Sequence, residues 1–125
     1  MVKRVNSATN VGRNGLHDWV IQRFSAIILA AYTIVLLGWM IMTPDIDYAA
    51  WSALFQTTWM RIFSLLALIS LCAHAWVGMW TIATDYLTSM TFGGAATAVR
   101  LLFQAGCVIL IFIYLVWGIQ ILWGL

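Results

Sequence analysis

Residues 63–86 read FSLLALISLCAHAWVGMWTIATDY, and this stretch governs the interpretation of the whole chain. It is long and apolar enough to cross a membrane as a helix, because about 20 residues span the roughly 30 Å of a bilayer's hydrocarbon layer. His74 nevertheless lies in its middle, and Asp85 and Tyr86 close its far end. A titratable side chain at bilayer depth is rare and is by default a candidate functional residue.

The helical repeat places His74 and Asp85 on the same face of this segment. They are eleven residues apart in the sequence. This separation corresponds to three turns plus roughly 20° of rotation and to about 16 Å along the helix axis. The same face carries only small or polar residues, namely Ser70, His74, Gly78, Thr81 and Asp85. We expect the opposite face to meet lipid or apolar neighbours, since it carries Leu68, Cys72, Trp76 and Met79.

The composition excludes a soluble domain. Of the 125 residues, 64% are hydrophobic and 8% are charged, whereas soluble domains average about 25% charged residues. The apolar residues form long continuous runs rather than the alternating pattern of a membrane β-barrel. The predicted fold is therefore an all-α integral membrane protein. The net charge of +2 is small and scattered and does not indicate a nucleic-acid partner.

Hydropathy predicts three transmembrane helices, at about residues 19–42, 59–84 and 98–123. We expect residues 1–18 to form a polar tail with Asp18 as the N-cap of the first helix, and residues 19–125 to form the membrane domain. Pro44 is expected to end the first span. The tail lacks the features of a cleavable signal peptide. Residues 87–98 are expected to form a loop containing Gly93 and Gly94.

The distribution of basic residues predicts the orientation in the membrane. Lys3, Arg4, Arg13 and Arg23 lie at the N-terminal end, whereas no Lys or Arg occurs between residues 42 and 60. Cytoplasmic flanks of membrane helices are enriched in such residues. We therefore expect a cytoplasmic N-terminus and a periplasmic C-terminus, with residues 85 and 86 emerging at the cytoplasmic face.

His74 admits three interpretations. A buried imidazole must find hydrogen-bonding partners within lipid, so it can simply bond across a helix interface. It can also be an axial haem ligand or part of a proton relay. Ser70 and Gly78 lie one turn to either side and leave room for a flat macrocycle. The other histidine, His17, lies outside the span, so a second haem ligand would have to come from another chain. No grouped ligands suggest a zinc site.

The end of the second span and the start of the first are two further candidate sites. Asp85 and Tyr86 can be a solvated loop residue and an interfacial aromatic. A phenol and a carboxylate can also bind a quinone headgroup, with the phenol donating to a quinone carbonyl. The segment GRNGLHDW, residues 12–19, can be a turn and helix cap. Alternatively, Arg13, His17 and Asp18 can help to dock a peripheral protein or to supply protons.

Two motifs resemble the hydrophobic membrane anchor of bacterial succinate dehydrogenase, the respiratory complex II of the type associated with a b-type cytochrome. They are GRNGLHDWVIQR, residues 12–23, and LLALISLCAHAWVGMWTIATDYL, residues 65–87. The similarity is close over residues 11–87 and extends only in general character to the third span. The segment 87–98 departs from the family pattern, since it is longer and lacks basic residues before Arg100.

The resemblance implies a cofactor, a substrate and partner chains. It implies that a second three-helix anchor, the cytochrome b anchor subunit, shares haem b with this chain. It further implies that a flavoprotein and an iron–sulfur protein of the same complex bind at the cytoplasmic face of the bacterial inner membrane. Electrons would pass from succinate through FAD and iron–sulfur clusters to ubiquinone, linking the tricarboxylic acid cycle to respiration.

The resemblance also assigns residue roles. His74 is expected to be an axial ligand of the haem iron, Tyr86 to donate to the quinone, and Asp85 to support Tyr86. Supporting roles are expected for Ser70, Gly78, Arg23, His17 and Asp18. No catalytic residue is expected in this chain alone.

Three alternatives to this assignment can be weighed from the residues. The chain can anchor a quinol:fumarate reductase, because direction depends on redox potentials that other chains set. It can also be a purely structural tether, for which His74 would be unnecessary. A proton-coupled transporter is disfavoured, because the sequence has no Glu and no Asp deep in a span.

Overall fold

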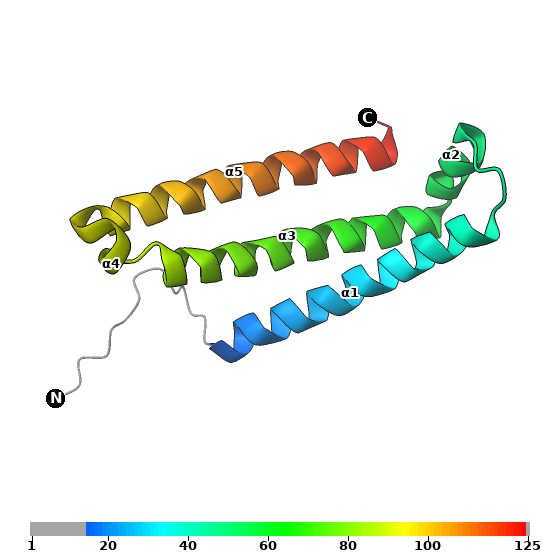
Figure 1. Ribbon diagram of the computed structural model, residues 1–125. Helices are drawn as coiled ribbons and strands as arrows, with labels where there is room; N and C mark the ends of the chain where they lie inside the picture. The colour runs from blue at the N-terminus through cyan, green and yellow to red at the C-terminus, as the bar shows by residue number, and fades with distance from the viewer. Residues whose placement is uncertain (1–14, 125) are drawn as a thin grey trace.

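The structure is a computed structural model that describes residues 15–124, and nearly all of these residues are helical. Three long helices run side by side and two short connections join them (Figure 1). In chain order the elements are α1 (Gly15–Met42), α2 (Tyr48–Gln56), α3 (Thr58–Tyr86), α4 (Ser89–Phe92), the 3₁₀ turn η1 (Gly93–Ala95) and α5 (Ala96–Trp123). This architecture confirms the predicted all-α fold with three spans.

The long helices extend slightly beyond the spans that hydropathy predicts. α1, α3 and the α4–α5 segment are each long and apolar enough to cross a membrane. α1 begins at Gly15, four residues before the expected start of the span, and α5 begins at Ala96. Backbone hydrogen bonding continues into polar flanking residues, which hydropathy does not count as membrane-spanning. Of the tail expected at residues 1–18, residues 15–18 belong to α1 and residues 1–14 lie outside the described residues.

Asp18 does not have the predicted capping role. It lies in the first turn inside α1 rather than at an N-cap position before the helix. The prediction took the start of the apolar run for the start of the helix, and the helix begins earlier. A carboxylate in the first turn still interacts favourably with the positive end of the helix dipole.

The connection between the first two spans contains a helix that the sequence analysis treated as loop. The backbone turns at Pro44 and Asp45, and Asp45 has a φ of 55°. Asp47 then caps α2 by accepting a hydrogen bond from the backbone amide of Ala50 at 2.7 Å. Trp51 of α2 contacts Trp39 of α1, with ring centroids 6.1 Å apart. α2 is thereby held against the end of α1.

Thr57 joins α2 directly to α3. It is both the C-cap of α2 and the N-cap of α3. Its hydroxyl donates to the carbonyl of Leu54 at 2.6 Å, and its own carbonyl accepts from the amide of Arg61 at 3.1 Å. With a single residue between them, α2 and the start of α3 have little freedom to move apart.

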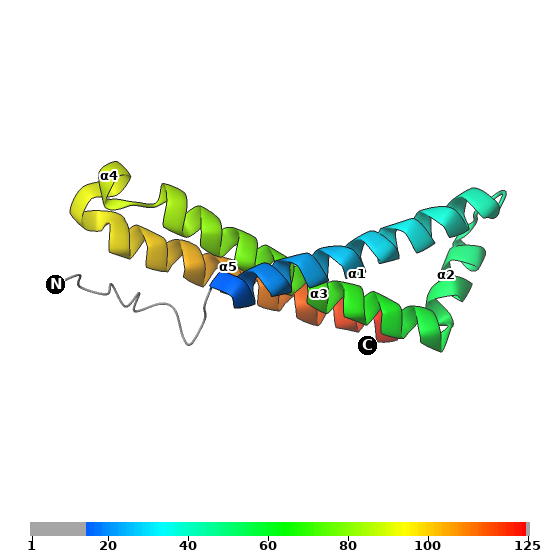
Figure 2. The same cartoon turned by 90° about the horizontal axis from the view of Figure 1, so that it is seen from below.

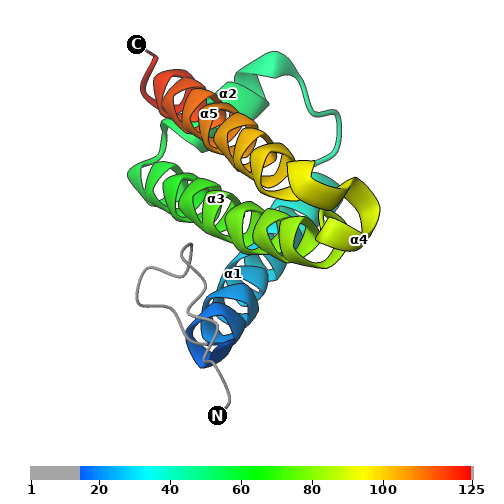
Figure 3. The same cartoon turned by 90° about the vertical axis from the view of Figure 1, so that its left-hand side faces the viewer.

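α3 is the central helix of the bundle. It packs against α1 on one side and α5 on the other (Figures 1 and 3). α1 crosses α3 obliquely, as the view from below shows (Figure 2). The hydroxyls of Tyr32 and Ser64 are 2.8 Å apart, and the Tyr32 ring meets Phe63 edge-on. These contacts join α1 to the first half of α3.

Most large apolar side chains lie on the outside of the bundle. The buried apolar residues of the described chain are Leu54, Met60, Ala67, Val77, Ala83 and Ala96. Small residues at helix interfaces are typical of membrane bundles, where dispersion and close backbone approach replace hydrophobic burial. The exposed apolar surface agrees with a bundle surrounded by lipid and by other membrane helices.

Leu68 and Gly118 form a close contact between α3 and α5. A Cβ atom added at Gly118 would lie 2.5 Å from Cδ2 of Leu68. Gly118 therefore allows the Leu68 side chain to lie directly against the backbone of α5. Leu68 belongs to the face of α3 that the sequence predicts to meet apolar neighbours, and α5 is that neighbour.

We expect Gly118→Val to destabilise the bundle, because the added side chain would overlap Leu68. Overpacking of this kind costs about 1–3 kcal/mol. Gly106→Val is the matched control on the same helix, since nothing lies within 4 Å of a Cβ added there. The midpoint of thermal unfolding in detergent should be lower for the Gly118 variant. Equal midpoints would show that the Leu68 contact is not close in solution.

Candidate functional site

Both ring nitrogens of His74 face α1. Nδ1 lies 3.1 Å from the hydroxyl of Ser25, and Nε2 lies 3.4 Å from the side-chain nitrogen of Gln22. The imidazole is half-buried between α1 and α3. Two polar groups of α1 therefore satisfy a histidine that would otherwise be costly to place among apolar helices. Of the interpretations considered from sequence, hydrogen bonding across a helix interface is already realised within this chain.

An open cleft lies next to His74 between α1 and α3. Its volume is about 320 Å³. Residues from the first three turns of α1 and from the second half of α3 line it: Asp18, Trp19, Gln22, Arg23, Ala26, His74, Val77 and Thr81. The cleft combines an imidazole, a guanidinium, a carboxylate and an aromatic ring at one end of the crossing between the two helices.

Arg23 is positioned for an anionic group at this cleft. Its guanidinium carbon lies 5.6 Å from the centroid of the Trp19 ring, which is within the range of a cation–π contact. The arginine side chain remains exposed. A guanidinium carries five N–H donors in a planar fork that suits carboxylate and phosphate oxygens. The side chain is therefore available to an anionic ligand or to an acidic residue of another chain.

Gln22 and Ser25 are the site residues that the sequence analysis missed. Both are polar residues within the apolar run of α1, three positions apart, so they share a helix face. This spacing of two polar residues on one face of an apolar helix is the sequence pattern from which they could have been identified. Their relation to His74 depends on how α1 crosses α3, which no local pattern contains. Oε1 of Gln22 is buried and lacks a hydrogen-bond partner among the described residues, while its amide nitrogen contacts His74.

The structure brings together only part of the predicted polar face of α3. His74 and Thr81 line the cleft, and a Cβ added at Gly78 would meet the Gln22 amide at 3.9 Å, an ordinary contact. Gly78 therefore faces α1 without being crowded by it. Ser70 is buried outside the cleft, and Asp85 is exposed beyond it.

Tyr86 and His17 project from the same end of the bundle. Tyr86 is the last residue of α3 and its side chain is 69% exposed. His17 is exposed near the start of α1, with Nδ1 3.9 Å from an oxygen of Asp18. This end of the bundle also carries α4 and the start of α5 (Figure 1). The phenol is therefore accessible to a ligand or to another chain.

Among the described residues, the candidate metal ligand is the single imidazole of His74, which suits the axial position of a haem. No group of three or more His, Cys, Asp or Glu side chains occurs in residues 15–124 that could hold a metal ion. Cys72 and Cys107 are free thiols. A lone imidazole beside an open, largely apolar cleft can act as one axial ligand of haem, which brings its own four nitrogens. A second axial ligand would then come from outside the described chain.

Arg100 fixes the end of α3 that carries Asp85 and Tyr86. Its Nε and Nη2 atoms both donate to the carbonyl of Leu87, at 3.3 and 3.0 Å. Leu87 is the C-cap of α3. A cation at a helix C-terminus bonds free carbonyls and interacts favourably with the helix dipole. Arg100 thereby connects the start of α5 to the residue that follows Tyr86.

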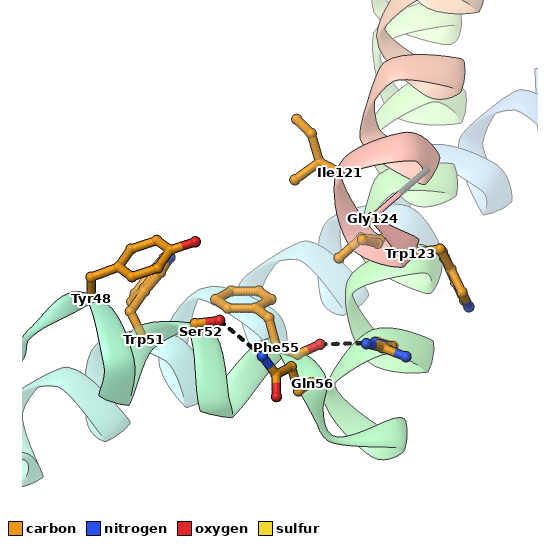
Figure 4. Close-up of a pocket in the computed structure, with 10 residues that line it drawn as sticks. Tyr48, Trp51, Ser52, Phe55, Gln56, Ile121, Trp123 and Gly124 are labelled. Carbon is orange, nitrogen blue, oxygen red and sulfur yellow. Dashed lines mark hydrogen bonds between the residues drawn. The ribbon is translucent and has the colours of Figure 1, made fainter.

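A cavity larger than the cleft beside His74 lies at the opposite end of the bundle, with a volume of about 520 Å³ (Figure 4). It is lined by Tyr48, Trp51, Ser52, Phe55, Gln56, Arg61 and residues 121–124. The Arg61 side chain donates through Nε to the carbonyl of Phe55 at 3.1 Å. None of the residues predicted from sequence to form a site lines this cavity. Its aromatic rings are typical of a membrane interface.

Comparison with known proteins identifies two similarities. Residues 3–116 match the family described as succinate dehydrogenase/fumarate reductase transmembrane subunit. A succinate dehydrogenase hydrophobic membrane anchor subunit from Coxiella burnetii is 35% identical over 111 residues, which cover 89% of this chain and 90% of that protein. The similarity therefore extends over α1, α3 and most of α5.

We expect Arg100→Ala to loosen the end of α3. A hydrogen bond from a charged donor contributes about 1.5–3 kcal/mol, so local opening should become roughly tenfold or more frequent. Hydrogen exchange of the amides at residues 84–92 should accelerate, and Arg100→Lys should have an intermediate effect because lysine is a point charge without the fork. Arg61→Ala, at the other end of the bundle, is the control. Unchanged exchange in the Arg100 variants would remove its role in fixing α3.

Proposed function

The chain belongs to the succinate dehydrogenase/fumarate reductase transmembrane subunit family, and on that premise we propose that it is a membrane anchor of succinate:ubiquinone oxidoreductase. In this proposal it holds haem b jointly with a partner anchor and contributes to the site where ubiquinone is reduced. The name of its Coxiella burnetii relative favours succinate dehydrogenase over fumarate reductase. The bacterial inner membrane is the proposed location.

The observation that carries the haem proposal is the placement of His74. Its half-buried imidazole lies at the crossing of α1 and α3 and borders an open cleft lined by both polar and apolar residues. Bound haem would supply a one-electron redox centre within the membrane. His74 would hold the iron, Gly78 would leave space beside the backbone, and Arg23 would offer N–H donors to the acidic groups of the porphyrin.

An incomplete donor set supports the proposal that the haem is shared. Within residues 15–124 the other histidine, His17, is exposed near the start of α1, whereas His74 lies in the middle of α3. A second axial ligand is therefore assigned to the partner, the cytochrome b anchor. The exposed apolar side chains offer ample surface for its helices. The flavoprotein and the iron–sulfur protein of the complex would bind at the cytoplasmic face.

Tyr86 is the proposed quinone-binding residue. Its exposed phenol stands at the end of α3, where a quinone headgroup can enter from the membrane interface. The phenol would donate a hydrogen bond to a quinone carbonyl. Asp85, the adjacent exposed carboxylate, would orient that donor or accept a proton. Arg100 would keep both residues in place through its bonds to Leu87.

We expect His74→Ala to remove the b-type absorbance of the purified membrane complex, because the iron would lose an axial ligand. The measurement is a reduced-minus-oxidised optical spectrum, normalised to covalently or tightly bound flavin in the same sample. His17→Ala is the matched control, since it removes the other histidine without touching the cleft.

A wild-type complex that contains its flavin but no haem would overturn the haem assignment. So would a His74→Ala complex with an unaltered spectrum. In either case the chain would remain a membrane anchor, and His74 would be a structural histidine that joins α1 to α3.

We expect Tyr86→Phe to lower quinone reductase activity by roughly tenfold, because one hydrogen bond to the quinone would be lost. Succinate oxidation with an artificial acceptor that bypasses the membrane-embedded chains should not change. Tyr48→Phe is the control, since Tyr48 is also highly exposed but lies at the opposite end of the bundle. Unchanged quinone reduction would assign Tyr86 to the interfacial aromatics instead.

A further inference from the structure

Two polar contacts link His74 to one turn of α1, and a third joins their two partners within that turn. The hydroxyl of Ser25 lies 3.1 Å from Nδ1 of His74 and donates to the backbone carbonyl of Gln22, also at 3.1 Å. The side-chain nitrogen of Gln22 lies 3.4 Å from Nε2 of His74. The contacts thus form a closed circuit that passes through both ring nitrogens and returns to the same residue of α1.

The pattern of these bonds favours one tautomer of the imidazole. A hydroxyl has a single hydrogen to donate, and that of Ser25 goes to the Gln22 carbonyl. With its hydrogen directed to that carbonyl, the Ser25 oxygen is free to accept from Nδ1, which favours the tautomer with the hydrogen on Nδ1. Nε2 is left with a lone pair, which accepts from the Gln22 amide. In the other tautomer Nε2 would carry the hydrogen, and this N–H would face the N–H of the Gln22 amide. Nδ1 would then be an acceptor without a donor, because the Ser25 hydroxyl donates to the Gln22 carbonyl.

Burial singles out Ser25 within α1. It is the one buried residue among the 28 residues of that helix, with 4% exposure. A serine in an apolar helix can satisfy its hydroxyl on a carbonyl of the preceding turn without any contact to a neighbouring helix. Ser25 bonds the Gln22 carbonyl of its own helix and also contacts His74 of α3, because its side chain lies at the point where α1 meets the imidazole.

We propose that Ser25 is a positioning residue for haem: it holds His74 in the Nδ1-protonated tautomer and presents Nε2 as the iron-binding atom. The inference rests on the proposed function, since it concerns how His74 would bind haem. Metal-bound histidines usually donate their second N–H to an oxygen that sets the ring orientation and raises the basicity of the ligand nitrogen. Ser25 supplies that oxygen.

The role of Gln22 follows from the same geometry. Its amide donates to Nε2, the atom that iron would occupy, so it has to leave when haem binds. Its Oε1 is buried without a hydrogen-bond partner among the described residues, so the side chain has reason to rearrange. Gln22 therefore occupies the ligand position without being needed for haem retention, in contrast to Ser25.

The experiment measures haem release from the intact membrane complex, purified from its own membranes. Transfer of haem to excess apomyoglobin gives the release rate, and electron paramagnetic resonance of the oxidised complex reports the axial ligand field. We expect Ser25→Ala to release haem about tenfold faster or more, which is the usual effect of removing such a partner. Its resonance positions should also shift. Ser25→Thr keeps a hydroxyl on the same carbon and should restore the wild-type behaviour.

Three further variants separate the effect of the Ser25 hydroxyl from that of side-chain volume, from general effects on α1 and from the Gln22 contact. Ser25→Cys keeps the size of the side chain but replaces the oxygen by a weak acceptor, so it should resemble Ser25→Ala even if that variant assembles poorly. Thr33→Ala removes an exposed hydroxyl of the same helix that bonds only its own turn, and should have no effect. Gln22→Leu should leave the release rate unchanged or lower it.

The outcomes distinguish this inference from the proposed function. A wild-type complex without haem would overturn both. A haem-containing wild type whose Ser25→Ala and Ser25→Cys variants keep its release rate and resonance positions would overturn the role of Ser25 alone. Faster release from Gln22→Leu than from Ser25→Ala would also overturn it, because the retaining contact would then lie on Nε2 and not on Nδ1.

Discussion

The contact between the imidazole of His74 and α1 is the polar interaction on which the arrangement of the bundle depends. In a bilayer no water is available to satisfy a histidine, so its two ring nitrogens must find partners on a neighbouring helix. Ser25 and Gln22 provide them. This requirement selects both the rotation of α1 about its axis and the height at which it crosses α3, because a turn of either helix would leave a buried polar group without a partner.

The two sides of α3 are packed by different means. On the α1 side the contacts are polar or aromatic, with His74 in the second half and the Tyr32–Ser64 pair in the first. On the α5 side a close contact is steric, with Leu68 lying against the backbone at Gly118. Polar contacts specify position, whereas small-residue packing mainly allows close approach. The α1–α3 pair is thus the more precisely determined half, and it is the half that holds the candidate site.

Much of the architecture could be predicted from sequence, because the membrane imposes a strong constraint. Long apolar runs establish the three spans, and the resemblance over residues 11–87 identifies the family to which the chain belongs. His74 was predicted as the central polar residue from its position alone. The membrane orientation and the roles of His74, Asp85 and Tyr86 remain predictions of the sequence that the proposed experiments address.

The relation between helices was the part that could not be predicted. Gln22 and Ser25 gain their importance only because α1 crosses α3 beside His74 (Figure 2). The polar face of α3 was correct as a local pattern, but the cleft extends along it only to Thr81, so Asp85 lies outside. α2 was overlooked because a nine-residue helix carries too little hydropathy to be distinguished from a loop.

The single-residue junction at Thr57 has a mechanical consequence. α2 carries an aromatic cluster that includes Trp51 and Phe55, with ring centroids 4.9 Å apart, and such rings favour the boundary between headgroups and acyl chains. Since α2 is joined to α3 at Thr57, a preference of α2 for the membrane interface would fix the depth of α3 in the bilayer. A change in bilayer thickness would then be absorbed by tilt or by the other end of the bundle, and the depth of His74 below the α2 surface would stay constant.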